Sequence, residues 1–171
     1  MRLFGIVCTV LLGLVLMIGT AQAGDAYVKG GLILEPAENL DISDRYLIDF
    51  GSDYFVSDFL GIGWEVGTAY YSEDFGGETL HVVPLNIWGN VKIAPPTEGL
   101  RPFGKAGIGV LTRLVSFGGD HEHESNLGFH FTGGLELGAP GRIAFVVELQ
   151  GQKEFADNRD FTVILLAGIQ F

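Results

Sequence analysis

The sequence has a single cysteine, Cys8, and it lies within a strongly apolar N-terminal stretch. If that stretch is removed, no thiol remains, which excludes disulfides, cysteine metal sites and cysteine nucleophiles. Positive charge is also scarce, because 10 Lys and Arg stand against 21 Asp and Glu, for a formal net charge of -11. Such a chain would repel a phosphate polymer, so we expect no nucleic acid as a partner.

Long apolar runs are missing after the N-terminus, which argues against a helical membrane protein. Hydrophobic residues nevertheless make up 47% of the sequence and charged residues only 18%, and there are 26 Gly and 13 Phe. This apolar content is high for a water-soluble protein. The composition favours a β-protein with one face in an apolar medium.

The N-terminal segment has the features of a secretory signal peptide. Arg2 gives it a positive start, Leu3 to Ile18 are almost all apolar, and Ala21-Gln22-Ala23 supplies the small residues that signal peptidase requires. We therefore expect a signal peptide over residues 1–23 and a mature domain over residues 24–171. The alternative is an uncleaved membrane anchor, because the apolar run is near spanning length.

The rest of the chain alternates in chemistry with a period of two residues, which is typical of strands that face two different media. From Asn126 to Gly138, apolar residues such as Leu127 fall at odd positions, while Gly and polar residues such as His130 fall at even ones. The alternating segments are Tyr27–Leu34, Arg45–Phe50, Phe59–Ser72, Leu80–Ile93, Phe103–Leu114, Asn126–Gly138, Arg142–Gln152 and Phe161–Phe171.

These segments predict an all-β fold, an eight-stranded antiparallel up-and-down transmembrane β-barrel with both termini on one side. The expected short turns lie near Ser52-Asp53, near Pro95 to Glu98 and at Ala139-Pro140-Gly141. The expected outward loops span about Glu35–Asp44, Glu73–Glu78, Ser116–Ser125 and Lys153–Asp160. A soluble β-sandwich or lipocalin-like barrel also alternates, but it buries its apolar face. Here the face opposite the apolar one is rich in Gly, which suits a narrow interior.

The polar face of the predicted strands should line the barrel interior. The residues expected there are Lys29, Asp49, Glu65, Lys92, Lys105, Arg113, His130, Glu136, Arg142 and Glu148. Opposite charges in a narrow space should pair. Eight strands leave an interior just wide enough for side chains, so a polar plug is favoured over a gate or narrow pore. The aromatic residues expected in the barrel wall or its girdles are Tyr27, Trp64, Tyr70, Tyr71 and Trp88.

Three stretches resemble sequences of bacterial outer-membrane proteins. The ending Phe161-Thr-Val-Ile-Leu-Leu-Ala-Gly-Ile-Gln-Phe171 resembles the signal read by the barrel-assembly machinery, with Ile169 and Phe171 on the apolar face. Arg101-Pro-Phe-Gly-Lys-Ala-Gly-Ile-Gly-Val110 and Pro84-Leu-Asn-Ile-Trp-Gly-Asn-Val-Lys92 resemble two recurrent strands of small barrels. Together they resemble the OmpA-like/OmpX-like superfamily of eight-stranded outer-membrane barrels. The resemblance implies a place in the bacterial outer membrane among its lipid and lipopolysaccharide, and it says little about activity.

Two overlapping motifs in the third expected loop could carry chemistry. His121 and His123, within Asp120-His-Glu-His-Glu124, could bind a transition metal. A flexible loop does not preorganise such ligands, however, and a solvated acidic loop is favoured. The stretch His123-Glu-Ser-Asn126 resembles the H-x-S-N motif of lipid A deacylases. In that family the motif lies on the next-to-last strand, which here contains no His or Ser, so we interpret the match as coincidence.

We therefore expect no enzymatic activity and no cofactor. The leading interpretation is an outer-membrane protein with a structural or surface-interaction role through acidic outward loops and with a lumen plugged by polar side chains. The alternatives are a narrow porin-like channel and, less favoured, a lipid A-modifying hydrolase. More than half of the acidic residues fall in the four expected loops. Carboxylate oxygens suit divalent cations, so weak Ca²⁺ or Mg²⁺ association is expected at this rim.

Overall fold

A computed structural model describes residues 25–35, 46–75, 78–97, 99–117, 120–138, 143–155 and 161–171. The expected signal peptide lies outside these residues. Within them, no helix has the length and apolar character needed to cross a membrane.

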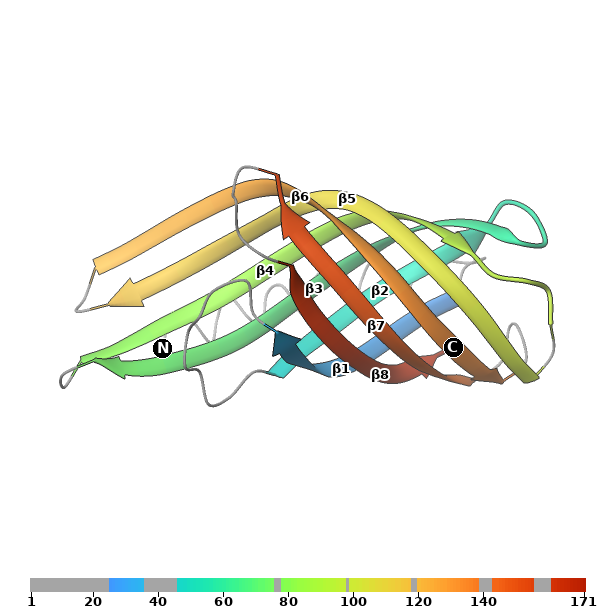
Figure 1. The fold of residues 1–171 in the computed structure, drawn as a ribbon, viewed down its shortest axis with the longest axis horizontal. Helices are drawn as coiled ribbons and strands as arrows, with labels where there is room; N and C mark the ends of the chain where they lie inside the picture. The colour runs from blue at the N-terminus through green and yellow to red at the C-terminus, as the bar shows by residue number, and fades with distance from the viewer. Residues whose placement is uncertain are drawn as a thin grey trace.

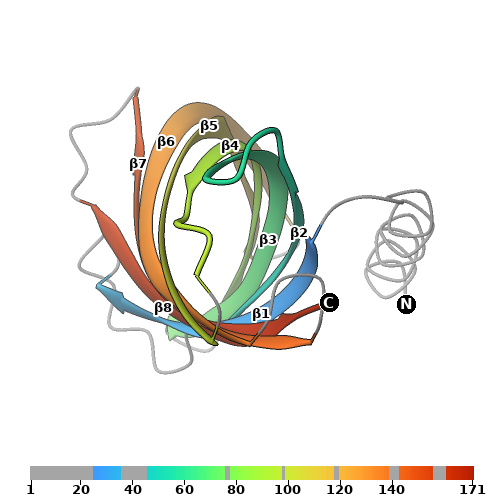
Figure 2. The ribbon, with the colours of Figure 1, turned by 90° about the vertical axis from the view of Figure 1, so that its right-hand side faces the viewer.

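The described residues form eight antiparallel strands that close into a barrel (Figure 1, Figure 2). Each strand pairs with its neighbours in sequence, and β8 pairs with β1. The strands are β1 (Asp25–Glu35), β2 (Tyr46–Phe55), β3 (Leu60–Phe75), β4 (Glu78–Ile93), β5 (Gly99–Phe117), β6 (Asp120–Gly138), β7 (Ala144–Glu154) and β8 (Thr162–Gln170). This confirms the predicted all-β, eight-stranded up-and-down architecture.

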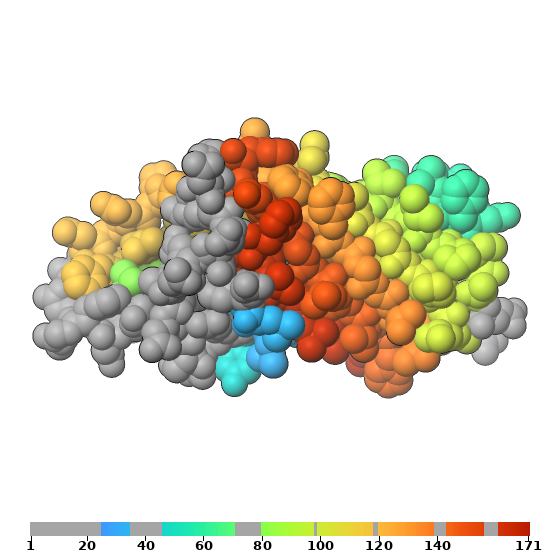
Figure 3. Space-filling model, in the orientation of Figure 1, coloured from blue at the N-terminus to red at the C-terminus, as the bar shows by residue number. Residues whose placement is uncertain are grey.

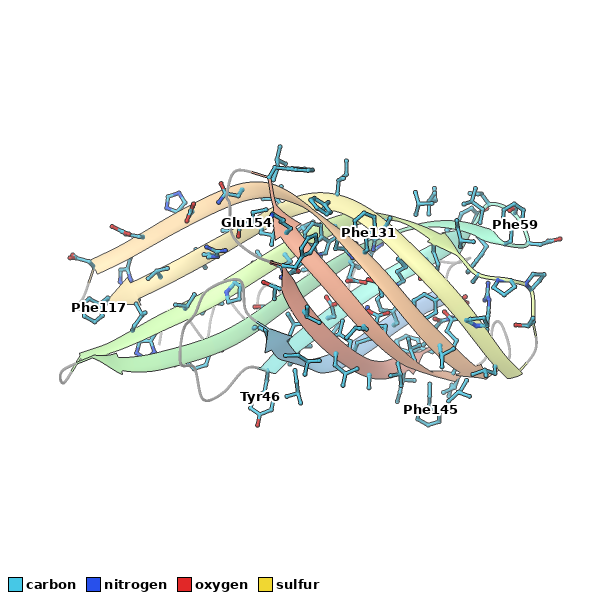
Figure 4. The ribbon with its side chains drawn as sticks, in the orientation of Figure 1. Tyr46, Phe59, Phe117, Phe131, Phe145 and Glu154 are labelled. Atoms are coloured by element: carbon cyan, nitrogen blue, oxygen red, sulfur yellow. The ribbon has the colours of Figure 1, made fainter. Side chains whose placement is uncertain are left out.

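Side chains alternate between the outside and the inside of the barrel, because successive residues of a strand point to opposite faces. On the outside, Ile108 and Ile143 are each 70% exposed, whereas Glu65 and His130 inside are 0% exposed. Figure 4 shows Tyr46 and Phe145 pointing away from the barrel. The apolar side chains thus cover the outer surface and the charged ones are enclosed. This is the reverse of a soluble β-barrel and decides against the lipocalin-like alternative.

The two ends of the barrel differ. At one end, which we call the turn end, the N–H of Ala26 donates to the carbonyl of Phe171 at 3.1 Å, and the N–H of Phe171 donates to the carbonyl of Ala26 at 2.8 Å. The connections over residues 56–59 and 94–97 lie at the same end. The opposite end, which we call the extended end, is formed by the hairpins β3–β4 and β5–β6 (left in Figure 1).

The strands of these two hairpins are much longer than the other strands of the barrel. The strands β5 and β6 have 19 residues each and β3 and β4 have 16, whereas β8 has 9 and β2 has 10. Pairing among β3, β4, β5 and β6 therefore continues beyond the described parts of β2 and β7. We call this four-stranded part the protruding sheet; it consists of residues 71–75, 78–82, 111–117 and 120–126.

The turn predicted near Ser52-Asp53 is wrong. The strand β2 continues through both residues to Phe55, and the chain bends over residues 56–59 instead. Two adjacent small polar residues are typical of a turn. Here Asp53 is instead an interior residue, fully buried and 2.9 Å from Lys92 Nζ.

The bounds predicted for the outward loops over Glu73–Glu78 and Ser116–Ser125 are also wrong, because most of these residues belong to strands. The strand β3 continues to Phe75 and β4 starts at Glu78, while β5 continues to Phe117 and β6 starts at Asp120. Polar composition indicated loops at these places. In a sheet that protrudes beyond the barrel, both faces can carry polar side chains, so composition does not mark where the strand ends.

The turn predicted near Pro95 is confirmed, since residues 94–97 belong to no strand. Arg101 Nε donates to the carbonyl of Pro95 at 3.1 Å and ties this connection to β5. The predicted turn at 139–141 lies outside the described residues, as do residues 36–44 of the first loop and 156–160 of the fourth. Lys153 and Glu154, which were expected in the fourth loop, belong to β7.

Candidate functional site

The barrel interior holds a cluster of buried ion pairs around Lys29. The Lys29 ammonium lies 2.9 Å from Glu65 Oε2 and 3.7 Å from Asp49 Oδ2, and it also donates to Glu148 Oε1. None of these four side chains is more than 3% exposed. They come from β1, β2, β3 and β7, so the cluster joins four strands across the interior.

A second cluster surrounds Lys92, nearer the turn end. Lys92 Nζ lies 2.9 Å from Asp53 Oδ2 and also donates to Glu136 Oε1. Arg101 Nη1 lies 3.5 Å from the other oxygen of Glu136, Oε2. The ring of Phe103 lies beside this cluster, with its centroid 4.8 Å from Lys92 Nζ.

Lys105 links the two clusters. Its ammonium lies 3.4 Å from Glu65 Oε2 and 3.6 Å from Asp53 Oδ2. The Tyr27 hydroxyl donates to the same Glu65 oxygen at 2.8 Å, and the Tyr27 ring centroid is 4.2 Å from Lys105 Nζ. We call the whole set the central ion network: Lys29, Asp49, Asp53, Glu65, Lys92, Arg101, Lys105, Glu136 and Glu148.

Part of this network has the spacing of a cation site. Asp49, Glu65 and Glu148 offer oxygens that lie within 4.8 Å of one another. The Lys29 ammonium, however, already contacts all three carboxylates. One oxygen of each of these residues has no hydrogen-bond partner, namely Asp49 Oδ1, Glu65 Oε1 and Glu148 Oε2. The cluster is thus a cation site that the protein fills with its own lysine.

His130 belongs to a separate interior group of neutral polar side chains. Its Nε2 is 2.7 Å from Asn90 Oδ1, its Nδ1 is 3.2 Å from Thr132 Oγ1, and its ring centroid is 4.9 Å from that of Trp88. A side chain at Gly107 would overlap both Asn90 and His130, so the absence of a Cβ there makes room for the group. Both ring nitrogens therefore have protein partners, and His130 is not placed to act as a metal ligand.

Apolar side chains fill two other parts of the interior. One cluster contains Leu47, Ala69, Ile164 and Leu166, which are at most 6% exposed. The other contains Ala94, Phe103 and Val146 and lies toward the turn end. Polar and apolar side chains together pack the interior, as expected for a barrel of eight strands.

A smaller polar cluster lies where the protruding sheet meets the barrel. Arg113 Nη2 donates to Glu154 Oε1, and the Arg113 side chain is 21% exposed. Asn126 Nδ2 donates to Glu154 Oε2 at 2.9 Å and to Glu124 Oε1 at 2.9 Å. Figure 4 shows Glu154 at this end of β7. The cluster joins β5, β6 and β7 at the mouth of the barrel.

The segment Asp120–Asn126 of β6 presents different chemistry on its two faces. His121, His123 and Ser125 share the outward face of β6 with Leu127 and Phe131, whereas Glu122, Glu124 and Asn126 share the inward face with Gly128 and His130. The imidazoles and the carboxylates therefore point to opposite sides, so a metal ion held by His121 and His123 would not also contact the carboxylates of this segment. The Ser125 hydroxyl is 3.0 Å from the Thr112 hydroxyl on β5.

Comparison with solved structures finds the same architecture in several bacterial outer-membrane proteins. The chain is similar to Neisserial surface protein A, with 12% identity and a TM-score of 0.62 over 86% of this chain and 94% of that one. It is similar to the N-terminal barrel domain of Pseudomonas aeruginosa OprF, with 16% identity and a TM-score of 0.56 over 87% of this chain and 98% of that one.

A third similar structure is Ail, the attachment invasion locus protein of Yersinia pestis, with 16% identity and a TM-score of 0.54 over 88% of this chain and 100% of that one. No protein-family model matches the sequence, and no curated protein matches it either. The chain has the fold of the small eight-stranded outer-membrane barrels.

Within this outer-membrane barrel fold, the residues that the sequence assigned to the interior are mostly found there. Lys29, Asp49, Glu65, Lys92, Lys105, His130, Glu136 and Glu148 are buried, and Arg113 is half-buried at the mouth. Arg142 lies outside the described residues. The structure brings all the buried residues except His130 into the central ion network.

Five interior residues were missed or misplaced by sequence reasoning: Tyr27, Asp53, Trp88, Arg101 and Glu154. The expectation that Tyr27 and Trp88 belong to the wall or girdle is wrong, because each is only 2% exposed and lies inside. Their positions carried the signal, since Tyr27 is two residues before Lys29 and Trp88 is two residues after Asn86. Tyr70 fits the girdle expectation, at 49% exposed.

The residues of the expected assembly signal lie on the outer surface of the barrel. Phe171 is 51% exposed and Ile169 is 44% exposed, while Gln170 between them is buried. The backbone of Phe171 pairs with Ala26. The terminal aromatic ring is thus presented outward at the seam where β8 closes on β1.

Proposed function

We propose that the chain is an integral protein of the bacterial outer membrane that acts at the cell surface through the protruding sheet. The membrane part of the proposal is supported by the apolar outer surface, where side chains such as Ile87, Ile108 and Phe131 are more than half exposed. Exposure of this kind is costly in water and favourable in lipid. Figure 3 shows one face of this surface, formed by side chains of β5 to β8.

The orientation follows from the position of the chain ends. In bacterial barrels with an even number of strands, both termini lie on the periplasmic side. Here the start of β1 and the end of β8 lie together at the turn end, where Ala26 pairs with Phe171. The extended end, with the protruding sheet, would then face the exterior. Lipid and lipopolysaccharide would surround the wall, and the barrel-assembly machinery would read the end of β8.

The single observation that carries the surface role is the outer edge of β6 over Asp120–Asn126, which pairs with no described residue on the side away from β5. From Asp120 to Asn126 this strand pairs with β5. Its pairing with the described part of β7 begins at Gly128, next to a hydrogen bond from the Phe155 N–H to the Leu127 carbonyl. An unpaired strand edge accepts a further strand from a partner. Glu122 and Glu124 line one face of this edge, so the favoured partner strand is basic.

Other observations support the same proposal. The attachment role in the name of Ail belongs to that protein, and it supports the proposal that a barrel of this fold can serve such a role. The packed interior argues against a porin-like channel as the main role. The third of the predicted acidic loops is replaced by an acidic part of a strand, namely residues 120–126 of β6. Weak Ca²⁺ or Mg²⁺ association at these carboxylates stays part of the proposal.

The test removes this outer edge while leaving the barrel intact. A variant in which residues 114–123 are replaced by Asn-Gly keeps the pairing of Arg113 with Glu124 and closes the hairpin with a favoured turn. Binding of a soluble peptide of alternating lysine and valine is measured by fluorescence anisotropy in detergent. We expect the wild-type protein to bind, and the shortened variant and Glu122→Lys/Glu124→Lys to lose binding. Equal binding by all three proteins would refute the role of the edge.

A further inference from the structure

Two histidines on β6 take part in none of the contacts described above. His121 and His123 are both exposed, and they lie two residues apart in a strand that begins at Asp120. Side chains two residues apart in a strand point to the same face, with Cα atoms about 6.5–7 Å apart. The backbone that carries them is fixed by pairing with Ser116 and Leu114 of β5. Both imidazoles therefore project side by side from an ordered element.

The carboxylates of the same segment point the other way. Glu124 accepts a hydrogen bond from Asn126, whose side chain also donates to Glu154 at the barrel mouth. Glu122 shares this inward face. A cation held by the two imidazoles would not meet these oxygens. Nitrogen ligands without carboxylates favour zinc, nickel or copper over calcium and magnesium.

We propose that His121 and His123 together chelate one first-row transition-metal ion of the Zn²⁺, Ni²⁺ or Cu²⁺ class on the outward face of the protruding sheet. Neutral imidazole is a common ligand for these ions. Once one ring has bound the ion, the second ring is already on the same side of the strand and binds at a high effective concentration. Water molecules complete the coordination. A flexible loop would lack this advantage, and the strand supplies it.

A third histidine provides a matched comparison. His81 lies on the same face two strands away, because Ser116 pairs with both His81 and His121. Its Nδ1 is 2.8 Å from the Tyr70 hydroxyl, and the two rings are stacked with centroids 6.0 Å apart. Among the described residues, three ligand atoms come within 4.8 Å of one another only at Asp49, Glu65 and Glu148. His81 is therefore an exposed histidine outside the chelate.

The first test is zinc titration by calorimetry on the protein purified in detergent with a tag that contains no histidine. We expect one ion per barrel, and His121→Ala or His123→Ala should each weaken binding by about a hundredfold, the advantage of the second ligand. His81→Ala and Glu122→Gln should bind as the wild-type protein does. A comparable loss of zinc binding in His81→Ala would contradict the two-histidine site. The site would also be contradicted if the wild-type protein bound no more zinc than the double variant His121→Ala/His123→Ala.

The second test separates strand geometry from composition. The double variant Glu122→His/His123→Glu keeps two histidines and the same charge but puts one imidazole on each face of β6. We expect it to lose zinc binding as severely as His123→Ala does. If the transposed variant binds zinc as tightly as the wild-type protein, the segment is acting as a flexible histidine-rich tract, and the proposed chelate is refuted.

Discussion

Glu65 illustrates how single charged residues are tolerated inside the barrel. Its Oε2 accepts hydrogen bonds from the Tyr27 hydroxyl and the Lys29 ammonium and lies 3.4 Å from Lys105 Nζ. A buried charge is costly without partners, and removing one member of such a set strands the others. The stability of the interior should therefore depend strongly on this residue.

We expect Glu65→Ala to lower the free energy of unfolding by about 3–5 kcal/mol, because Lys29 and Lys105 would lose a shared partner in the interior. Denaturant unfolding followed by the fluorescence of Trp64 and Trp88 would measure it. The exposed Glu122→Ala serves as control and should leave the midpoint unchanged. An unchanged midpoint for Glu65→Ala would mean that water solvates the network, as in an open channel.

Two glycines, Gly109 on the inward face of β5 and Gly133 on the outward face of β6, give a second prediction at the scale of single residues. At Gly109, a methyl group would overlap the backbone carbonyl oxygen of Ile87, whereas at Gly133 nothing lies within 4 Å of the added atom. We expect Gly109→Ala to destabilise the barrel by about 1–3 kcal/mol through overpacking. Gly133→Ala should be neutral or slightly stabilising. Equal unfolding midpoints for the two variants would contradict the close approach of β4 and β5.

Sequence position predicted the interior better than residue type did. Lys29, Asp49 and Glu148 were assigned correctly by alternation alone, because the two-residue period is geometric. Tyr27 and Trp88 were misassigned because the usual place of aromatic rings in membrane barrels was given more weight than their position. Asp53 was missed for a similar reason, since a polar pair was interpreted as a turn. The ion-pair partners are set by the closure of the barrel, which alternation does not specify.

At the scale of strands, the number and direction of the elements followed from the sequence, but the length of the hairpins did not. Alternation between apolar and polar residues ends where β5 and β6 leave the apolar zone, near Leu114 and Leu127. Backbone pairing continues to Phe117 and Asp120. Hydrogen bonding between the strands, unlike the alternation, does not require an apolar environment. The two histidines and the carboxylates were therefore assigned to a loop. Alternation did not predict that the histidines lie on one face of a strand and the carboxylates on the other.

The last strand carries a prediction about assembly. Phe171 is exposed and contributes no side chain to the interior, while its backbone closes the seam with Ala26. Phe171→Asp should therefore refold in detergent with wild-type stability and yet reach the outer membrane of cells poorly. Phe171→Tyr, which keeps the ring, should assemble normally. The amount of folded barrel in the outer membrane is measured by comparing heat-treated and unheated samples on a gel. Normal amounts of Phe171→Asp would refute a role of Phe171 in assembly.

For the whole molecule, the interior packing predicts a closed barrel. The central ion network and the two apolar clusters fill the space between opposite walls. Purified protein in planar bilayers should therefore show no steady single-channel conductance in molar potassium chloride. Glu65→Ala/Glu148→Ala, which removes two of the crossing side chains, is the variant expected to leak. Steady openings of the wild-type protein would favour the porin-like alternative.

We propose that the barrel spans the outer membrane with its extended end outside. Single cysteines at Ser125, on the protruding sheet, and at Ser57, in the bend at the turn end, test it in a protein whose natural cysteine, Cys8, is replaced by serine. Intact cells are treated with a membrane-impermeant maleimide, and labelling is compared with that after lysis. We expect Ser125→Cys to be labelled in intact cells and Ser57→Cys to be labelled only after lysis. Labelling of Ser57→Cys and protection of Ser125→Cys in intact cells would contradict it.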